Sequence, residues 1–259
     1  MKHRLLKLLA ASAFAVSLTI AAPVSAATIQ LGFILDSSGS IGAGNWGVIT
    51  GGLASAINSF VPVGGPNTYE ISVVTFSSGT QTILNHQLIS TVAERTAAAA
   101  AVAAAPFLNT NTNYALAFSA MQAALSSSPN WNGGAITSYV NFATDGAPNE
   151  GGTGQPQRDA LIAAGVDNIS IEGIGISAAG ATLLQNFFCY PQACDSTLPF
   201  NTFPANGFYI GVNDAQGYAN AIAGKIQVVT DTQVPEPASM LLLGTGLLLA
   251  GRRRLLRRP

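Results

Sequence analysis

The sequence predicts an α/β fold: a doubly wound, Rossmann-like and mostly parallel sheet of six strands with helices on both faces. Strand-like and helix-like segments alternate between residues 27 and 230, as they do in parallel sheets that are covered on both faces. Two of the strand-like segments stop abruptly at an acid, Asp36 and Asp145. Ligands bind at the carboxyl ends of strands in sheets of this class, so both acids are candidate site residues.

The first half of this region supplies three strands and three helices. Residues 27–35 form an apolar run, and residues 69–77 alternate polar with β-branched side chains, as strands do. Residues 46–61 space their apolar side chains as a helix does. Residues 91–105 are rich in Ala and stop at Pro106, which also favours a helix. A short neighbouring strand over 80–87 and a helix over 113–127 complete this half.

The second half repeats the alternation and ends on a helix. Residues 135–144 are typical of a buried strand that ends before Asp145, and residues 155–166 form a helix closed by Gly165. The remaining predicted elements are a strand over 168–177, a helix over 179–188, a short strand over 207–212 and a last helix over 214–229.

Residues 1–26 carry the pattern of a secretory signal peptide. Lys2, Arg4 and Lys7 precede an uncharged, mostly apolar run over 8–22, and residues 24–26 supply small side chains for cleavage. The run is shorter than the about 20 residues that a membrane-spanning helix needs. We therefore expect the protein to be exported.

Residues 231–259 have a second pattern in three parts. The triplet Pro235-Glu236-Pro237 is followed by an uncharged, mostly apolar segment over 238–251 and then by five arginines. This order resembles the PEP-CTERM sorting signal of exported bacterial proteins. The resemblance implies a short transmembrane helix, tethering to the membrane that is at least transient, cleavage near the triplet by an exosortase, and delivery to the cell surface or an extracellular matrix. An ordinary tail anchor is the alternative, so the sequence leaves open whether the tail is cleaved or retained.

The region from residue 27 to residue 234 is acidic. Of the 11 Lys and Arg residues, three lie in the leader and five in the tail, which leaves three against 11 acids and a net charge of 3 − 11 = −8. Such a domain cannot neutralise a phosphate backbone, so we expect no nucleic-acid partner. Cations are the more plausible partners.

Cys189 and Cys194 are the only cysteines. In an exported protein they are expected to form a small disulfide loop, and two cysteines without clustered His do not make a zinc site. The irregular segment that contains them, 189–207, is either a partner-facing loop or a disulfide-stapled surface loop.

Oxygen-bearing side chains gather in three loops at the predicted carboxyl edge of the sheet. The segment from Asp36 to Ser40 offers one carboxylate and hydroxyls at alternate positions, residues 109–112 add two threonines before a helix, and Thr144-Asp145 follows a buried strand. A hard divalent cation takes oxygen ligands in a near-octahedral array, often with water in the shell. Three loops that meet at one edge could therefore supply two carboxylates and three hydroxyls to one cation.

Other chemistries fit this pattern less well. A phosphate-binding P-loop needs a Lys after its glycines, and a nucleophile elbow needs Gly two residues before and two residues after its Ser; neither pattern is present around Ser38 or Ser40. His86 is the only His after the leader and is remote in sequence from Asp36 and Asp145. We therefore expect no Ser-His-Asp triad, and we place His86 on a strand surface.

Three motifs in this order resemble the von Willebrand factor A-type (VWA) domain: Asp36-x-Ser38-x-Ser40, a Thr before a helix, and Thr144-Asp145-Gly146 after a buried strand. The resemblance covers residues 27–230 and implies a doubly wound sheet with a metal-ion-dependent adhesion site (MIDAS). It also implies one divalent cation, Mg²⁺ first with Ca²⁺ or Mn²⁺ as alternatives. The metal ligands that it implies are Asp36, Ser38, Ser40, Thr112 and Asp145.

The resemblance leaves the threonine ligand open. The family usually has Gly before this Thr, whereas this chain has Asn109-Thr110-Asn111-Thr112. We assign Thr112, because Ala117 and Phe118 then fall where the family has a small and a large apolar helix residue. Thr110 is the alternative.

The resulting hypothesis is an exported, metal-dependent adhesion or binding protein, not an enzyme, that ligates a carboxylate of a protein or an acidic polysaccharide. Two alternatives stay open. One is a metal-independent structural component of a surface or matrix, and the other is a hydrolase that uses Asp36 and Asp145. The sequence indicates neither the identity of the partner nor an oligomeric state.

Overall fold

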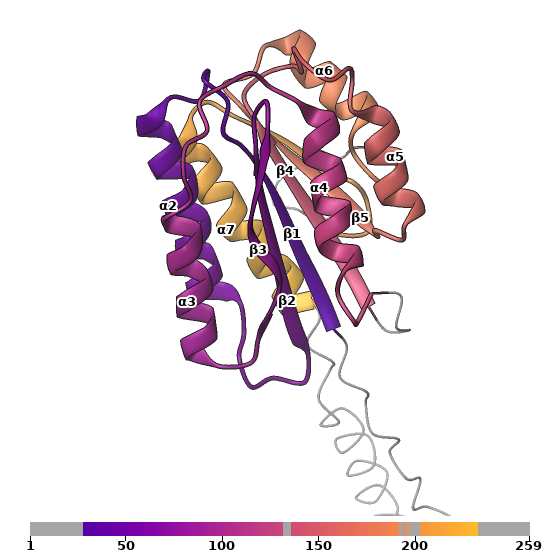
Figure 1. Cartoon of the computed structure of the whole chain (residues 1–259). Helices are drawn as coiled ribbons and strands as arrows, with labels where there is room; N and C mark the ends of the chain where they lie inside the picture. The colour runs from indigo at the N-terminus through magenta and orange to yellow at the C-terminus, as the bar shows by residue number, and fades with distance from the viewer. Residues whose placement is uncertain (1–27, 132–135, 192–193, 195, 197–202, 233–259) are drawn as a thin grey trace, which may run out of the picture.

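A six-stranded sheet lies between two layers of helices in the computed structural model of this protein, which describes residues 28–131, 136–191, 194, 196 and 203–232 (Figure 1). The strand order is β3-β2-β1-β4-β5-β6, and all neighbours are parallel except the antiparallel pair β2 and β3. The predicted doubly wound, mostly parallel fold is thereby confirmed. The strands are β1 (Thr28–Asp36), β2 (Thr68–Phe76), β3 (Thr80–Ile89), β4 (Ile136–Thr144), β5 (Asn168–Ile174) and β6 (Tyr209–Val212).

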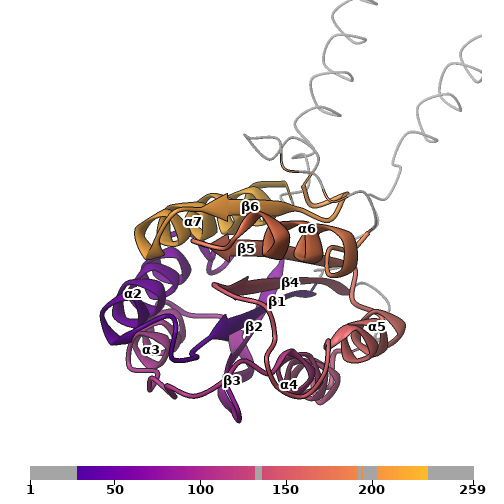
Figure 2. The same ribbon diagram turned by 90° about the horizontal axis from the view of Figure 1, so that it is seen from above.

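Helices cover both faces of the sheet, as the view from above shows (Figure 2). One face carries α2 (Ala43–Phe60), α3 (Val92–Ala103) and α7 (Ala215–Thr232). The other face carries α4 (Tyr114–Ser126), α5 (Gln155–Ala163) and α6 (Ala178–Phe187). A strand that is buried on both faces reads as a continuous apolar run, which explains why β1 has almost no polar residue before Asp36.

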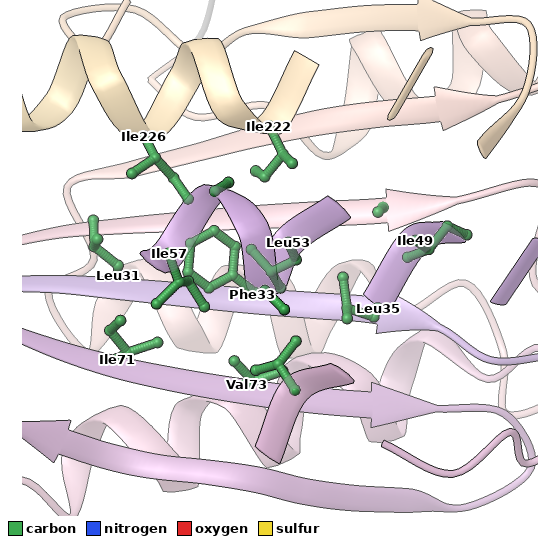
Figure 3. Packing of buried hydrophobic residues seen from close by; sticks show 14 of the residues in the cluster. Leu31, Phe33, Leu35, Ile49, Leu53, Ile57, Ile71, Val73, Ile222 and Ile226 are labelled. Carbon is green, nitrogen blue, oxygen red and sulfur yellow. The ribbon is translucent and has the colours of Figure 1, made fainter. Parts of the chain in front are cut away.

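The larger of the two cores lies between β1, β2 and the helices α2 and α7. Phe33 of β1 packs in a cluster with Leu53 of α2 and Ile222 of α7 (Figure 3). Each fully buried side chain of this size contributes about 1.5–3 kcal/mol to folding. Gly52 allows the two helices to approach closely, because a Cβ at this position would lie 2.4 Å from the Cβ of Ala219.

Local side-chain chemistry sets where several helices begin. Thr91 and Glu94 form a capping box at the start of α3, in which the Thr91 hydroxyl accepts from the Glu94 amide. The Asn113 side chain accepts from the Leu116 amide at 3.1 Å and caps α4. Because this cap fixes the first turn of α4, it also fixes the end of the loop that carries the two candidate threonines.

Two predicted elements end earlier than expected. The strand predicted over 168–177 ends at Ile174, because Gly175 turns the chain with φ +61°. The helix predicted over 155–166 ends at Ala163. The strand predicted as short, 80–87, is longer than expected and forms the antiparallel edge strand β3.

Cys189 and Cys194 are bonded to each other in the structure. Cys189 is buried, and the next residue, Tyr190, bridges to Ile169 of β5. The disulfide therefore lies where the chain leaves α6 and returns to the sheet.

Candidate metal centre

Three loops that are far apart in sequence meet at one end of the sheet, the upper end in Figure 1. β1 and β4 are parallel neighbours, and their last residues, Asp36 and Thr144, are joined by a hydrogen bond of 2.7 Å. The loop after β1 also runs along the loop before α4. Ser38 and Thr110 form a parallel bridge there, and the Gly39 amide donates to the Thr110 carbonyl at 2.8 Å.

Asp36 is a buried acid with two donors. The residue is 2% exposed, and its carboxylate accepts hydrogen bonds from the Ser38 amide at 2.8 Å and from the Thr144 hydroxyl at 2.7 Å. Burial raises the pKa of Asp36 to about 6, although these hydrogen bonds lower it. A nearby cation favours the ionised form of a carboxyl, so a metal bound here would lower the free-energy cost of burying Asp36.

The two serines of the first loop connect Asp36 to the second carboxylate. The hydroxyls of Ser38 and Ser40 lie 3.2 Å apart, and the Ser40 hydroxyl donates to Asp145 at 2.8 Å. Partial burial raises the pKa of Asp145, against the hydrogen bond from Ser40. Four of the five predicted ligands are thus brought together.

The two candidate threonines differ in what their hydroxyls already contact. The Thr110 hydroxyl bonds the Ser77 hydroxyl and accepts from the Ser78 amide at 3.0 Å. The Thr112 hydroxyl makes no hydrogen bond with any residue that the structure describes, and Thr112 is 4% exposed. This difference favours Thr112 as the metal ligand, because its hydroxyl oxygen is not used in a hydrogen bond with a described residue.

The loop after β4 holds Thr112 by its backbone. The Asn149 side chain accepts from the Thr112 amide at 2.9 Å, and the Thr112 carbonyl accepts from the amides of Asn149 and Glu150 at 3.1 and 3.2 Å. Glu150 in turn accepts from the Ser78 hydroxyl at 2.7 Å and from the Asn111 amide at 3.0 Å, and these bonds lower the pKa of Glu150. Thr112 and Asp145 are therefore held by one connected loop.

Tyr114, the first residue of α4, supports the same loop from inside. Its ring is fully buried, and its hydroxyl bonds the Thr144 hydroxyl at 3.1 Å and the Gly146 carbonyl. Gly154 closes the loop against Tyr114 with φ +77°, where a Cβ would lie 2.5 Å from the Tyr114 Cβ. A residue other than Gly would push this loop away from the site.

Sequence reasoning missed Tyr114, Asn149 and Glu150. None of them stands at a fixed spacing from the predicted ligands, because each reaches the site through a contact between loops. No pattern in the chain could have identified them.

The donor set fits a hard divalent cation. All five predicted ligands offer oxygen, and two are carboxylates whose combined charge balances a divalent ion. Among the described residues, no three His, Cys, Asp or Glu side chains are grouped so that they could hold a metal ion. The nitrogen and sulfur ligands of a structural zinc site are therefore missing from them.

His86 lies away from this end of the sheet. It sits in edge strand β3 beside Gln87, which pairs with Ile71 in the middle of β2. Its φ of +37° accompanies a bulge in the pairing, and its backbone amide donates to the Ser72 hydroxyl at 3.0 Å. His86 is half-buried at this position rather than fully on the strand surface.

The family model for the von Willebrand factor type A domain matches residues 30–204. The chain belongs to the VWA domain family. The predicted resemblance is confirmed. A search of curated proteins finds no match to the chain.

Solved structures show the same fold in proteins of low sequence identity. Proximal thread matrix protein 1 (PTMP1) from the mussel byssus, solved with a zinc-occupied MIDAS motif, has a TM-score of 0.61 and 19% identity over 79% of this chain and 48% of that one. The pilus adhesin SpaC from Lactobacillus rhamnosus GG, in its open conformation, has a TM-score of 0.58 and 12% identity over 80% of this chain and 30% of that one.

A von Willebrand factor type A protein from Catenulispora acidiphila has a TM-score of 0.54 and 16% identity over 78% of this chain and 42% of that one. This chain spans less than half of the length of each of these three chains. At such identities the likeness establishes the VWA fold alone.

The tail of the chain matches a second family model, the PEP-CTERM protein-sorting motif, over residues 233–258. This match confirms the predicted resemblance of the tail. The leader, the triplet Pro235-Glu236-Pro237 and the apolar segment 238–251 lie outside the described residues. Within the described ranges, no helix is long and apolar enough to cross a membrane.

Proposed function

We propose that this VWA domain binds one divalent cation through Asp36, Ser38, Ser40, Thr112 and Asp145, and uses it to ligate a carboxylate of a partner. The observation that supports this most is the convergence of oxygen atoms from separate loops. Asp36 accepts from the Ser38 amide, the Ser38 hydroxyl bonds the Ser40 hydroxyl, and the Ser40 hydroxyl donates to Asp145. A cation in their midst would exchange these hydroxyl contacts for metal–oxygen bonds.

Mg²⁺ is the expected ion, with Ca²⁺ or Mn²⁺ as alternatives. Mg²⁺ keeps several waters and is held by one or two carboxylates rather than by a complete protein cage, and this site offers two carboxylates among hydroxyls. A water in the shell can be displaced by a carboxylate from outside. PTMP1 was solved with zinc in its MIDAS motif, so Zn²⁺ belongs in the titration series.

The proposed setting is outside the cell. A secretory leader and a PEP-CTERM tail would export the chain, tether it briefly by its C-terminus, and release it after cleavage near Pro235-Glu236-Pro237 to the cell surface or to an extracellular matrix. The proposed partner is a protein or an acidic polysaccharide on that surface. Mass spectrometry of the mature C-terminus tests whether the tail is removed.

Isothermal titration calorimetry of the purified protein with Mg²⁺, Ca²⁺, Mn²⁺ and Zn²⁺ tests the metal site directly. We expect one site, abolished by Asp36→Ala. Asp231→Ala is the matched control, because Asp231 is an exposed carboxylate near the end of α7. Partner binding by the same two variants is then measured in a pull-down from the native cell surface, with and without EDTA.

Partner capture that survives both EDTA and Asp36→Ala would overturn the metal-dependent mechanism and favour the metal-independent structural role. The hydrolase alternative is tested by a screen of glycan and phosphoester substrates, with the double variant Asp36→Ala, Asp145→Ala as the control. We expect no turnover by the wild-type protein. Turnover that the double variant lacks would make the site catalytic.

A further inference from the structure

The domain between the leader and the tail has three basic residues, Arg95, Arg158 and Lys225, and the structure describes all three. Lys225 of α7 is 3% exposed and forms a buried ion pair with Glu172 of β5. Its ammonium also lies 5.9 and 5.5 Å from the ring centres of Phe203 and Phe208. This charge is neutralised inside the protein and does not reach the surface.

The two arginines are also engaged. The side chain of Arg158 is 11% exposed and pairs with Asp159 at 2.9 Å. Arg95 is half-buried and donates to the Val61 carbonyl at 3.0 Å. Arg95 lies near the start of α3, and Val61 follows the end of α2, so this pair is at the end of the sheet opposite the candidate metal centre (Figure 1).

Several acids, in contrast, face solvent. Asp159, Asp167, Asp214 and Asp231 are exposed, and Glu150 is half-buried beside the candidate metal centre. The rim of that centre is otherwise built from small, uncharged polar side chains. Its exposed members include Ser40, Asn109, Thr110, Asn111 and Asn149.

This distribution of acidic and basic side chains determines the electrostatic potential that a binding partner encounters. A divalent cation would balance Asp36 and Asp145, and it would leave Glu150 without a basic partner among the described residues. A polyanion would gain one metal–carboxylate contact and would meet repulsion over the rest of its length, because the described domain offers it no free cation. Like charges across an interface cost affinity and slow association, whereas complementary charges do the opposite.

We propose that the carboxylate that completes the metal shell belongs to a basic protein segment: one Asp or Glu side chain flanked by Lys or Arg. The inference rests on the proposed function, since it concerns what the metal holds. The metal supplies the attachment to the single carboxylate, and the flanking cations meet Glu150, which lies beside the metal centre. An acidic polysaccharide is the disfavoured partner.

Four probes test this on the purified, magnesium-loaded protein by nuclear magnetic resonance titration, with and without EDTA. Three are peptides with blocked ends: one central Glu flanked by Lys, the same Glu flanked by Ser, and the Lys-flanked peptide with Gln in place of Glu. The fourth is a short oligogalacturonate. We expect the Lys-flanked Glu peptide to bind about tenfold more tightly than the Ser-flanked peptide at low salt, and the ratio to shrink about threefold or more near physiological ionic strength.

The oligogalacturonate should bind most weakly, and the Gln peptide should lose the dependence on magnesium. Glu150→Gln, which keeps an oxygen for Ser78 and Asn111 to donate to, should reduce the preference for the Lys-flanked peptide. Magnesium-dependent binding with no charge preference, or tightest binding of the oligogalacturonate, would overturn the inference and leave the proposed function standing. If no probe binds in a magnesium-dependent way, the proposed function itself fails.

Discussion

The two ends of the central sheet carry similar residues that do opposite things. At the carboxyl end of β1, Asp36 lies among the serines and the threonine of the candidate metal centre. At the other end, Glu70 of β2 is buried among Gln30, Ser128 and Asn130. Both places combine a buried carboxylate with hydroxyl and amide side chains, and a reading of composition alone would rank them equally.

The difference lies in the number of hydrogen-bond donors that each carboxylate has. Glu70 accepts from the Gln30 amide at 2.8 Å, from the Ser128 hydroxyl at 2.7 Å and from the Asn130 amide. Three protein donors thus form hydrogen bonds to this carboxylate. At the candidate metal centre the acids have fewer donors, and burial raises the pKa of Asp36 and of Asp145. The Thr112 hydroxyl makes no hydrogen bond with a described residue. We therefore interpret Glu70, whose carboxylate has three donors, as a structural residue, and we propose that the converging oxygens at the other end, which have fewer donors, hold the cation.

The largest expected effect is at the structural end. Glu70→Ala leaves three donors without an acceptor, and we expect it to lower the free energy of unfolding by about 3–4 kcal/mol. Urea denaturation monitored by circular dichroism measures this. The magnesium affinity of the folded fraction should stay within about twofold of wild type. A tenfold loss of affinity would contradict the separation of the two ends.

The pH dependence of stability should come from the metal end. Since the folded-state pKa of Asp36 is raised from 3.8 to about 6, its contribution to stability is fully present below pH 3.8 and is lost as pH rises through 6. The loss amounts to about 3 kcal/mol by linkage. Thermal melts of the metal-free protein across this window, compared with Asp36→Asn, isolate the contribution.

Magnesium should reverse the trend, because it requires the ionised carboxylates. The rise in melting temperature on adding Mg²⁺ should therefore be larger at pH 8 than at pH 5. Equal rises at both pH values would show that the ion binds elsewhere.

Asp36→Asn should weaken magnesium binding by about 100-fold or more, or about 2.7 kcal/mol, because it removes one of two carboxylates. The metal-free variant should be no less stable than wild type at pH 8, since it removes a buried charge. Calorimetry and urea denaturation on the same preparation measure both quantities. A variant that is unstable and still binds Mg²⁺ normally would make Asp36 a structural residue like Glu70.

The smallest effects should distinguish the two threonines. Thr112→Val should weaken magnesium binding about tenfold and change stability little, because its hydroxyl makes no hydrogen bond with a described residue. Thr110→Val should cost about 1 kcal/mol of stability through its bonds to Ser77 and Ser78, with affinity nearly unchanged. The opposite result would assign Thr110 as the ligand. Calorimetry on both variants decides it.

Much of the fold could be predicted from the sequence because its signals are local. The alternation of strands and helices and the apolar run before Asp36 each depend on neighbouring residues. The end of β5 differs from the prediction because a single residue, Gly175, turns the backbone there. The parallel pairing of β1 with β4 follows from the class of the fold, while its register depends on contacts between residues about 100 positions apart.

The sequence by itself determined the family, the acidic charge and the spacing of Asp36, Ser38 and Ser40, because a ligand spacing of two residues is a property of one loop. Only the tertiary structure decided which threonine has a free hydroxyl, that Glu70 is satisfied, and that all three basic side chains are engaged. These outcomes depend on which groups from distant segments meet. Hydrogen bonds and ion pairs between such segments leave no pattern along the chain.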